Sequence, residues 1–177
     1  MALHFLSSMS KEIVVLDSRK IIGLQIATNF HNEADPKISK ITPLVTKYIT
    51  ERVEDKIESK VSPGVLIAGY KDYEGSLATG VSYEGSYTYF VGAEVDNSCN
   101  IGELVMTEIP AGTYVKFTTS PGAMPEVIIR AWQEIWAMNT RELGGTRTFM
   151  VDFEVYDERA RDPGFMVIDI YIGINIE

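Results

Sequence analysis

Glu154 is the side chain in this sequence best suited to chemistry, because it is a carboxylate set between apolar and aromatic neighbours. It lies in residues 152–157, which read DFEVYD and have the pattern of a short strand. An ionised carboxylate beside aromatic surface is costly unless a cation or hydrogen-bond donors meet it. The segment therefore predicts a binding pocket with a negative wall, with an ordinary solvent-facing strand as the alternative.

A predicted hairpin supplies companions for Glu154. Residues 147–156 and 165–176 both have strand patterns, and they are joined by a turn near Asp162-Pro163-Gly164. Successive side chains point to opposite faces of a sheet, so a turn centred between Asp162 and Pro163 brings two phenols and a second carboxylate onto the face of Glu154. The expected pairs are Glu154 with Tyr171 and Tyr156 with Asp169.

Aromatic side chains elsewhere in the chain are candidates for the walls of such a pocket. Trp132 and Trp136 are four residues apart in a predicted helix and therefore share one helical face. Tyr89 lies in an aromatic strand with Tyr83 and Tyr87. A carboxylate among such rings would bind a lipophilic cation through ionic attraction and through cation–π contacts worth about 0.5–2 kcal/mol. Core packing is the alternative interpretation of these rings.

Other chemistries have little support in the sequence. Neither His4 nor His31 has a companion at metal-ligand spacing, and no glycine-rich phosphate loop occurs, so we expect no metal and no cofactor. Cys99 is the single cysteine, which excludes an intramolecular disulfide and suits a reducing compartment, the cytoplasm. The net charge of −9 argues against direct nucleic-acid binding. The apolar runs are too short to span a membrane.

Strand and helix patterns follow the same order twice along the chain. Aligning the two halves pairs Tyr70 with Phe153 and therefore Lys71 with Glu154, so that only one half carries the negative charge. The order strand, helix, strand, strand is predicted for residues 13–27, 38–59, 65–73 and 83–95, and again for 103–119, 124–139, 147–156 and 165–176.

This duplication predicts an α+β fold with antiparallel sheets, a pseudo-two-fold axis and a ligand groove between the halves. We expect one domain at residues 12–177, made of pseudo-repeats at about 12–96 and 102–177. Residues 1–11 are expected to form a flexible extension.

Several of these segments resemble the GyrI-like or AraC-type effector-binding family, and within it the stand-alone branch that includes integron-cassette proteins. The resemblance covers residues 12–177 and rests on four motifs in the family's order. They are IPAGTYVKF at 109–117, the helix with Trp132 and Trp136, DFEVYD at 152–157 and DIYIGI at 169–174.

The resemblance implies a duplicated α+β module whose groove binds hydrophobic cationic drugs. A glutamate in the family's Glu-x-Tyr strand contacts the ligand, and it corresponds to Glu154 here. The acidic and aromatic positions of the last strand correspond to Asp169 and Tyr171. Many relatives also carry a DNA-binding region, whereas here the module fills the chain, so we expect no DNA-binding domain.

Three functions remain open at this point. The first is binding of a lipophilic, cationic effector by Glu154, Tyr156, Asp169, Tyr171, Trp132, Trp136 and Tyr89, without catalysis. The second is hydrolysis of strained electrophilic genotoxins, with Glu154 as general base. The third is a protein-interaction module of the gyrase-inhibitor kind, and a regulatory protein partner is compatible with each of them.

Overall fold

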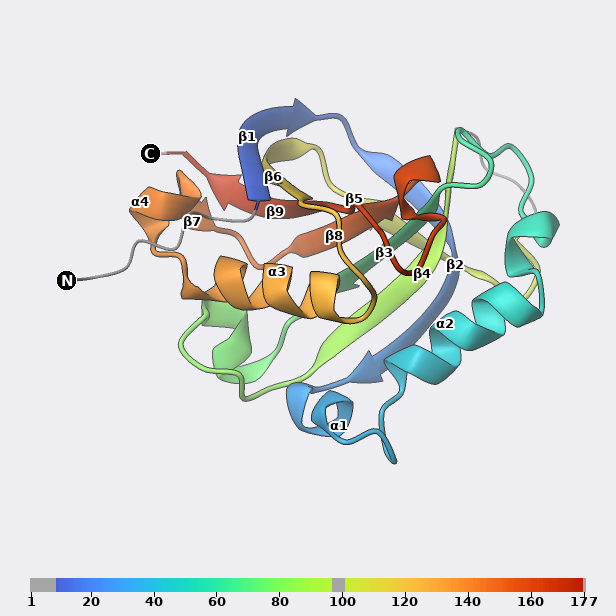
Figure 1. The fold of residues 1–177 in the computed structure, drawn as a ribbon, viewed down its shortest axis with the longest axis horizontal. Coiled ribbons are helices and arrows are strands. Elements are labelled where there is room, and N and C mark those ends of the chain that lie inside the picture. Colours follow the sequence, from blue (N-terminus) through green and yellow to red (C-terminus); the bar gives the residue numbers. More distant parts are fainter. Residues whose placement is uncertain (1–8, 97–100, 177) are drawn as a thin grey trace.

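One antiparallel sheet organises the described part of the molecule (Figure 1). The computed structural model describes residues 9–96 and 101–176, and Cys99 lies outside them. Nine strands are joined in the order β1-β6-β9-β8-β3-β4-β2-β5, and the short β7 pairs with β9. The strands are β1 (Met9–Leu16), β2 (Arg19–Thr28), β3 (Leu66–Lys71), β4 (Tyr87–Val95), β5 (Val105–Ile109), β6 (Gly112–Thr119), β7 (Thr146–Arg147), β8 (Val151–Tyr156) and β9 (Asp169–Asn175).

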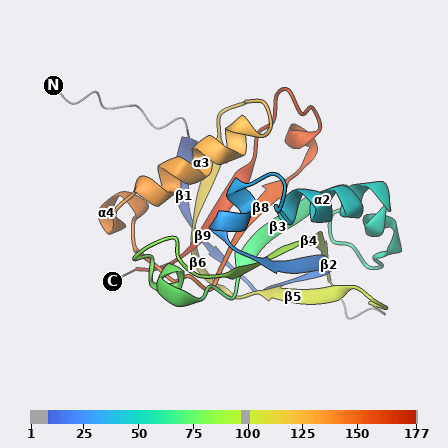
Figure 2. The ribbon, with the colours of Figure 1, turned by 90° about the horizontal axis from the view of Figure 1, so that it is seen from below.

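The two longest helices, α2 and α3, lie on the same face of this sheet (Figures 1 and 2). Each carries its own apolar stripe, and the two stripes bury separate clusters against the two halves of the sheet. The helices are α1 (Phe30–Ala34), α2 (Ile41–Thr50), α3 (Glu126–Ala137) and α4 (Thr140–Leu143), with short 3₁₀ turns at Val53–Lys56, Gly75–Thr79 and Glu158–Ala160.

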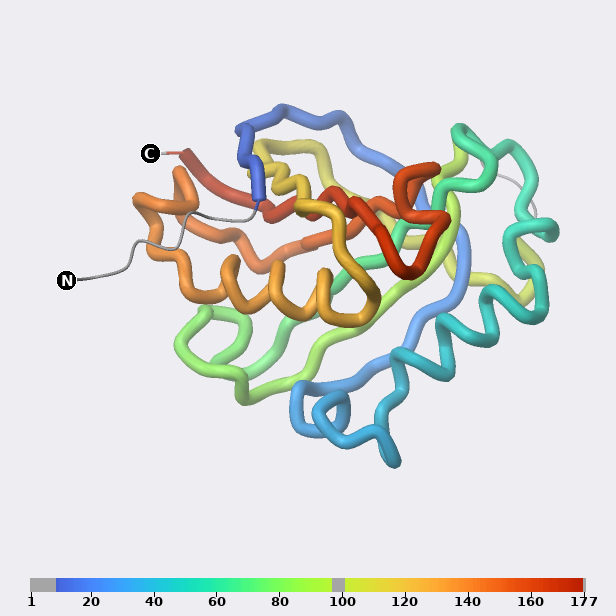
Figure 3. Tube along the Cα trace, viewed as in Figure 1, coloured from blue at the N-terminus to red at the C-terminus, as the bar shows by residue number. Residues whose placement is uncertain are grey.

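The strand order has a pseudo-two-fold symmetry that confirms the predicted duplication. β8 and β3, from opposite halves of the chain, are antiparallel neighbours at the centre, and the tube in Figure 3 shows them side by side. Outward from this pair, β9 corresponds to β4 and β6 to β2. The halves also exchange strands, because β1 pairs with β6 of the second half and β5 pairs with β2 of the first.

Several predicted boundaries were wrong, because breaks in the chain divide what the apolar pattern suggested were single elements. The strand expected at 13–27 is β1 and β2, and the one expected at 103–119 is β5 and β6, which lie in different parts of the sheet. Residues 9–11 were expected to belong to a flexible extension, but they are part of β1, which starts at Met9 and pairs with β6. The helix predicted at 124–139 ends at Ala137, and a capping box at Asn139 starts α4.

The predicted pairing of Lys71 with Glu154 across the repeat was also wrong. Glu154 lies on the helix-covered face of the sheet, where it meets Tyr70. Lys71 follows Tyr70 directly in β3 and so points to the opposite face. A pseudo-two-fold axis perpendicular to the sheet relates residues that lie on the same face. The residue of β3 that corresponds to Glu154 is therefore not Lys71, and the alignment of β3 with β8 differs by one residue from the predicted one.

Candidate ligand-binding site

A cavity of about 520 Å³ lies on the helix-covered face, between α1 and the start of α2 on one side and α3 on the other. This size is within the range of about 300–1,000 Å³ that is usual for small-molecule pockets. Its floor is formed by tyrosines of β3 and β4, which belong to the first half of the duplicated fold, and α3 adds a wall from the second half. The lining residues are Phe30, Glu33, Ala34, Ile41, Tyr70, Tyr73, Tyr83, Tyr87, Ile128, Ile129, Trp132, Gln133 and Trp136.

The aromatic rings of this cavity form a connected wall. Tyr70 of β3 contacts Trp132 of α3, with ring centroids 5.1 Å apart. Tyr70 also contacts Tyr87 of β4 at 5.6 Å. Phe30 of α1 meets Tyr87 at 5.4 Å and Trp136 at 5.9 Å, so the wall runs from one half to the other. Trp132 and Trp136 share one helical face, as their spacing predicted, and that face lines the cavity.

Glu154 lies behind this wall, in the central strand β8, and is 2% exposed. Its Oε1 accepts hydrogen bonds from Trp132 Nε1 at 2.6 Å and from the Tyr70 hydroxyl at 3.2 Å. Its Oε2 accepts one from the Tyr156 hydroxyl at 2.6 Å. Two of these donors, Trp132 and Tyr70, are also cavity-lining residues. A ligand in the cavity is therefore separated from the carboxylate by two rings that are hydrogen-bonded to it.

Burial raises the pKa of Glu154 above its usual value, and the hydrogen bonds from Tyr156, Trp132 and Tyr70 oppose that shift by stabilising the ionised form. Burial is also the main reason that the pKa values of Tyr70, Tyr89 and Tyr156 are raised, with Glu154 adding to each shift. The hydroxyls of Tyr70 and Tyr156 are thus held as donors to Glu154.

Glu33 is the one charged side chain among the described residues that line the cavity. Its oxygens accept from the Thr28 and Ser39 hydroxyls at 2.5 and 2.8 Å, and from the backbone N–H groups of Lys40 and Ile41 at 3.0 and 3.2 Å. Burial alone would raise the pKa of Glu33, but these hydrogen bonds lower it overall. Glu33 thus caps the start of α2 and places a negative charge at the cavity.

A buried ion pair holds one end of the aromatic wall. Arg147 Nη2 lies 2.7 Å from Asp152 Oδ2, which also accepts from the Tyr73 hydroxyl at 2.7 Å. The guanidinium lies 4.2 Å from the ring centroid of Trp136 and 4.5 Å from that of Phe149. Burial alone would lower the pKa of Arg147, but Asp152 raises it. The pair therefore fixes Tyr73 and Trp136, two of the cavity's rings.

The predicted pairing of β8 with β9 was wrong by one residue. Phe153 is opposite Tyr171 and Glu154 is opposite Ile170, so Asp169 and Tyr171 lie on the face away from Glu154. The ring of Tyr171 stacks on Phe153 with centroids 4.5 Å apart. The isoleucines of β9 pack in the core on the same side as Glu154.

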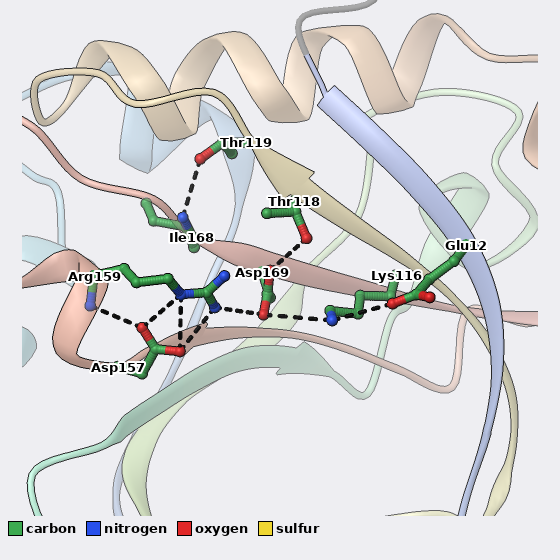
Figure 4. Close-up of polar contacts among 8 residues, drawn as sticks. All are labelled: Glu12, Lys116, Thr118, Thr119, Asp157, Arg159, Ile168 and Asp169. Atoms are coloured by element: carbon green, nitrogen blue, oxygen red, sulfur yellow. Dashed lines mark hydrogen bonds and ion pairs between the residues drawn. The ribbon is translucent and has the colours of Figure 1, made fainter.

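Asp169 belongs instead to a charged network on that other face (Figure 4). Arg159 Nη2 lies 2.7 Å from Asp169 Oδ2, and the Thr118 hydroxyl donates to Oδ1 at 2.6 Å. Lys116 Nζ lies 3.8 Å from the same carboxylate and 3.1 Å from Glu12. The network joins β1, β6 and β9, which accounts for Asp169 without a ligand.

The structure brings together five of the seven residues predicted for the site: Glu154, Tyr156, Trp132, Trp136 and Tyr89. Tyr89 and Tyr156 lie in the layer beneath the cavity, with Tyr89 in ring contact with Tyr70 at 5.4 Å. Tyr70 was not predicted as a site residue. Its position two residues after the apolar Ala68 in β3 indicated that both lie on one buried face. Phe30 and Glu33 were missed because the short helix α1 was not predicted.

Over residues 9–96 and 101–176, His, Cys, Asp and Glu form no group of three or more that could hold a metal ion. Within those same ranges, no helix has the length and apolar character needed to cross a membrane.

A duplicated sheet with an aromatic cavity between its halves, backed by a buried carboxylate, defines a small-molecule-binding module. Comparison with known families agrees: residues 12–174 match the integron-associated effector binding protein family, and the chain belongs to it. It is 35% identical over 111 residues to YobU of Bacillus subtilis (strain 168), which is named as a candidate transcriptional regulator. That match covers 62% of this chain and 63% of YobU, less than two thirds of its length.

Solved structures share the fold. An integron cassette protein from the mobile metagenome of Vibrio cholerae superimposes with a TM-score of 0.70 at 23% identity, covering 93% of this chain and 95% of its own. The protein SAV2435, solved bound to tetraphenylphosphonium, gives a TM-score of 0.68 at 15% identity, covering 94% of both chains. At these identities the likeness establishes the fold alone.

Proposed function

We propose that this protein is an effector-binding protein that takes lipophilic cations into the aromatic cavity, with Glu154 as the buried negative charge. The observation that carries the proposal is that no described residue gives Glu154 a cationic partner. Three carboxylates of the described residues are buried, and Asp152 and Asp169 each pair with an arginine. Glu154 is met by three uncharged donors instead. A cation in the cavity would supply the missing charge.

The rings between the cavity and Glu154 would help to bind such a cation. Tyr70 and Trp132 both donate to the carboxylate, and a ring that donates to an anion gains electron density through polarisation of the network. The faces of electron-rich rings attract cations, by about 0.5–2 kcal/mol for each contact. Glu154 thus acts on the ligand directly, through its charge, and indirectly, through the two rings.

A fold relative and the family's description both support this proposal. A protein with the same fold has been solved with tetraphenylphosphonium, a lipophilic cation, and the family is named for effector binding. Regulation of transcription, in which the bound state is communicated to a partner, is a further part of the proposal that the description of YobU suggests.

Binding of two ions of nearly the same shape and opposite charge would test the proposal. Tetraphenylphosphonium should bind in isothermal titration calorimetry, whereas tetraphenylborate should not. Glu154→Gln should weaken binding of the phosphonium by about tenfold or more, which corresponds to about 1.4 kcal/mol. Glu58→Gln, which removes the same charge at an exposed position, should bind like the wild type. Equal binding of both ions, or no effect of Glu154→Gln, would refute the proposal.

Hydrolysis by Glu154 finds no support in the geometry. A general base must reach a water molecule and the substrate together. The Glu154 carboxylate is 2% exposed and is covered on the cavity side by Trp132 and Tyr70. Binding without turnover therefore remains the function that we propose.

A further inference from the structure

The carboxylates near the cavity have little capacity to accept further hydrogen bonds. A carboxylate offers about four lone-pair sites, two on each oxygen. Glu33, which lines the cavity, already accepts four hydrogen bonds from the protein. Glu154 Oε1, which is bonded to two rings of the cavity wall, accepts two. Glu154 Oε2 accepts one, from the hydroxyl of Tyr156 in the layer beneath the cavity. The negative charges can therefore attract a ligand, but hydrogen bonds from the described residues leave neither Glu33 nor Glu154 Oε1 with a lone-pair site for a ligand N–H.

We propose that the cavity selects permanently charged cations without N–H donors, such as quaternary ammonium and phosphonium ions, over protonated amines with the same hydrophobic body. This inference rests on the proposed function and specifies its class of ligand. It does not follow from that function, because a carboxylate with free lone pairs would favour the amine.

The physical reason is the cost of desolvating donors. A primary ammonium group has three N–H donors, and each loses its water on entering an apolar cavity. The Gln133 amide and the tyrosine hydroxyls at the wall offer neutral acceptors, which satisfy only part of that demand. A quaternary ion has no donors to satisfy, and its methyl groups can lie against the faces of Tyr70, Tyr87 and Trp132.

The selectivity can be measured with a matched pair of ligands, (4-phenylbutyl)trimethylammonium and 4-phenylbutylammonium. Calorimetry on the full chain at neutral pH, where both are charged, should give at least about tenfold tighter binding of the quaternary ion. Since three additional methyl groups favour that ion in any apolar cavity, the decisive quantity is how the ratio of the two dissociation constants changes in a variant.

Tyr70→Phe is the decisive variant, because it frees one acceptor site on Glu154 Oε1 and keeps the ring. The primary ammonium should gain relative to the quaternary ion, and the ratio should fall by about fivefold or more. Tyr114→Phe is the matched control. It removes a phenol hydroxyl that donates to the Pro110 carbonyl at 2.7 Å, in the cluster on the far face of the sheet. Its ratio should equal that of the wild type.

The outcomes separate this inference from the function on which it rests. If both cations bind but the wild type prefers the primary ammonium, or if Tyr70→Phe leaves the ratio unchanged, the ligand class is wrong and cation binding stands. If Tyr114→Phe lowers the ratio as much as Tyr70→Phe, the effect is not local to Glu154 and the inference is also wrong. If neither cation binds the wild type, the proposed function fails and the inference fails with it.

Discussion

Glu154→Gln should remove a pH-dependent loss of stability that the wild type carries. The substitution is nearly isosteric, and the local geometry accommodates it. The amide oxygen can take the place of Oε1 and accept from Trp132 and Tyr70, while the amide nitrogen donates to the hydroxyl of Tyr156. The variant therefore keeps the packing of β8 and the three contacts, and loses only the ionisable proton.

The sign of the effect follows from the raised pKa of Glu154 in the folded state. Below its ordinary value of 4.5, the carboxyl is protonated in both the folded and the unfolded chain, and folding carries no cost of a buried charge. As the pH rises above that value, the unfolded chain loses its proton first, so the free energy of unfolding falls. The slope approaches about 1.4 kcal/mol per pH unit at most, and the loss is complete above the folded pKa.

Urea unfolding followed by circular dichroism, from about pH 4 to about pH 8, would measure this pH-dependent part of the free energy of unfolding. Other groups titrate too, but their contributions cancel in the difference between wild type and variant. The difference between the two free energies of unfolding should be constant near pH 4. As the pH rises, Glu154→Gln should become more stable relative to the wild type. For Glu58→Gln, the curve of unfolding free energy against pH should run parallel to that of the wild type. Parallel curves for wild type and Glu154→Gln would show that the buried carboxyl does not carry a raised pKa.

Four further outcomes are expected. Affinity for tetraphenylphosphonium should rise with pH through the pKa of Glu154, because the cation favours the ionised carboxylate, and calorimetry should show no such rise in Glu154→Gln. Asp152→Ala should cost about 3–5 kcal/mol in urea unfolding by leaving Arg147 buried without its partner; a cost below about 1 kcal/mol would contradict this. Gly69→Ala should cost about 1–3 kcal/mol, since its Cβ would lie 2.6 Å from the Asp152 carbonyl oxygen, and an unchanged melting temperature would show that the strands can separate. Asn139→Ala should cost about 1 kcal/mol by removing the cap of α4, whereas Asn139→Asp should retain most of the stability.

The overall architecture was predictable because its determinants are local and repeated. Apolar spacing located α2 and α3, and β-rich runs located the central hairpins of both halves. The exchange of β1 and β5 between the halves was not predictable, because pairing between distant strands leaves no periodic signal. Breaks such as Asp17-Ser18 are short, so continuous apolar patterns concealed the separation of β1 from β2.

The candidate site was predictable in composition but not in register. The expected pairing assumed a tight turn centred near Asp162, whereas the connection contains the 3₁₀ turn at Glu158–Ala160 and an irregular segment before β9. In the observed register, β8 and β9 are offset by one residue from the expectation. Because side chains alternate with a period of two, that single residue moved Asp169 and Tyr171 to the opposite face.

The observed register also explains why Glu154, of the three buried carboxylates of the described residues, is the one without a cationic partner. In the expected register, Glu154 and Asp169 would have shared a face, and Arg159 could have served both of them. The observed register puts the sheet between the two acids and leaves Arg159 and Lys116 with Asp169. On the helix-covered face, Arg147 is held by Asp152. The charge of Glu154 is thereby left to three neutral donors beneath an aromatic cavity, which is the arrangement that a cation from outside the protein would complete.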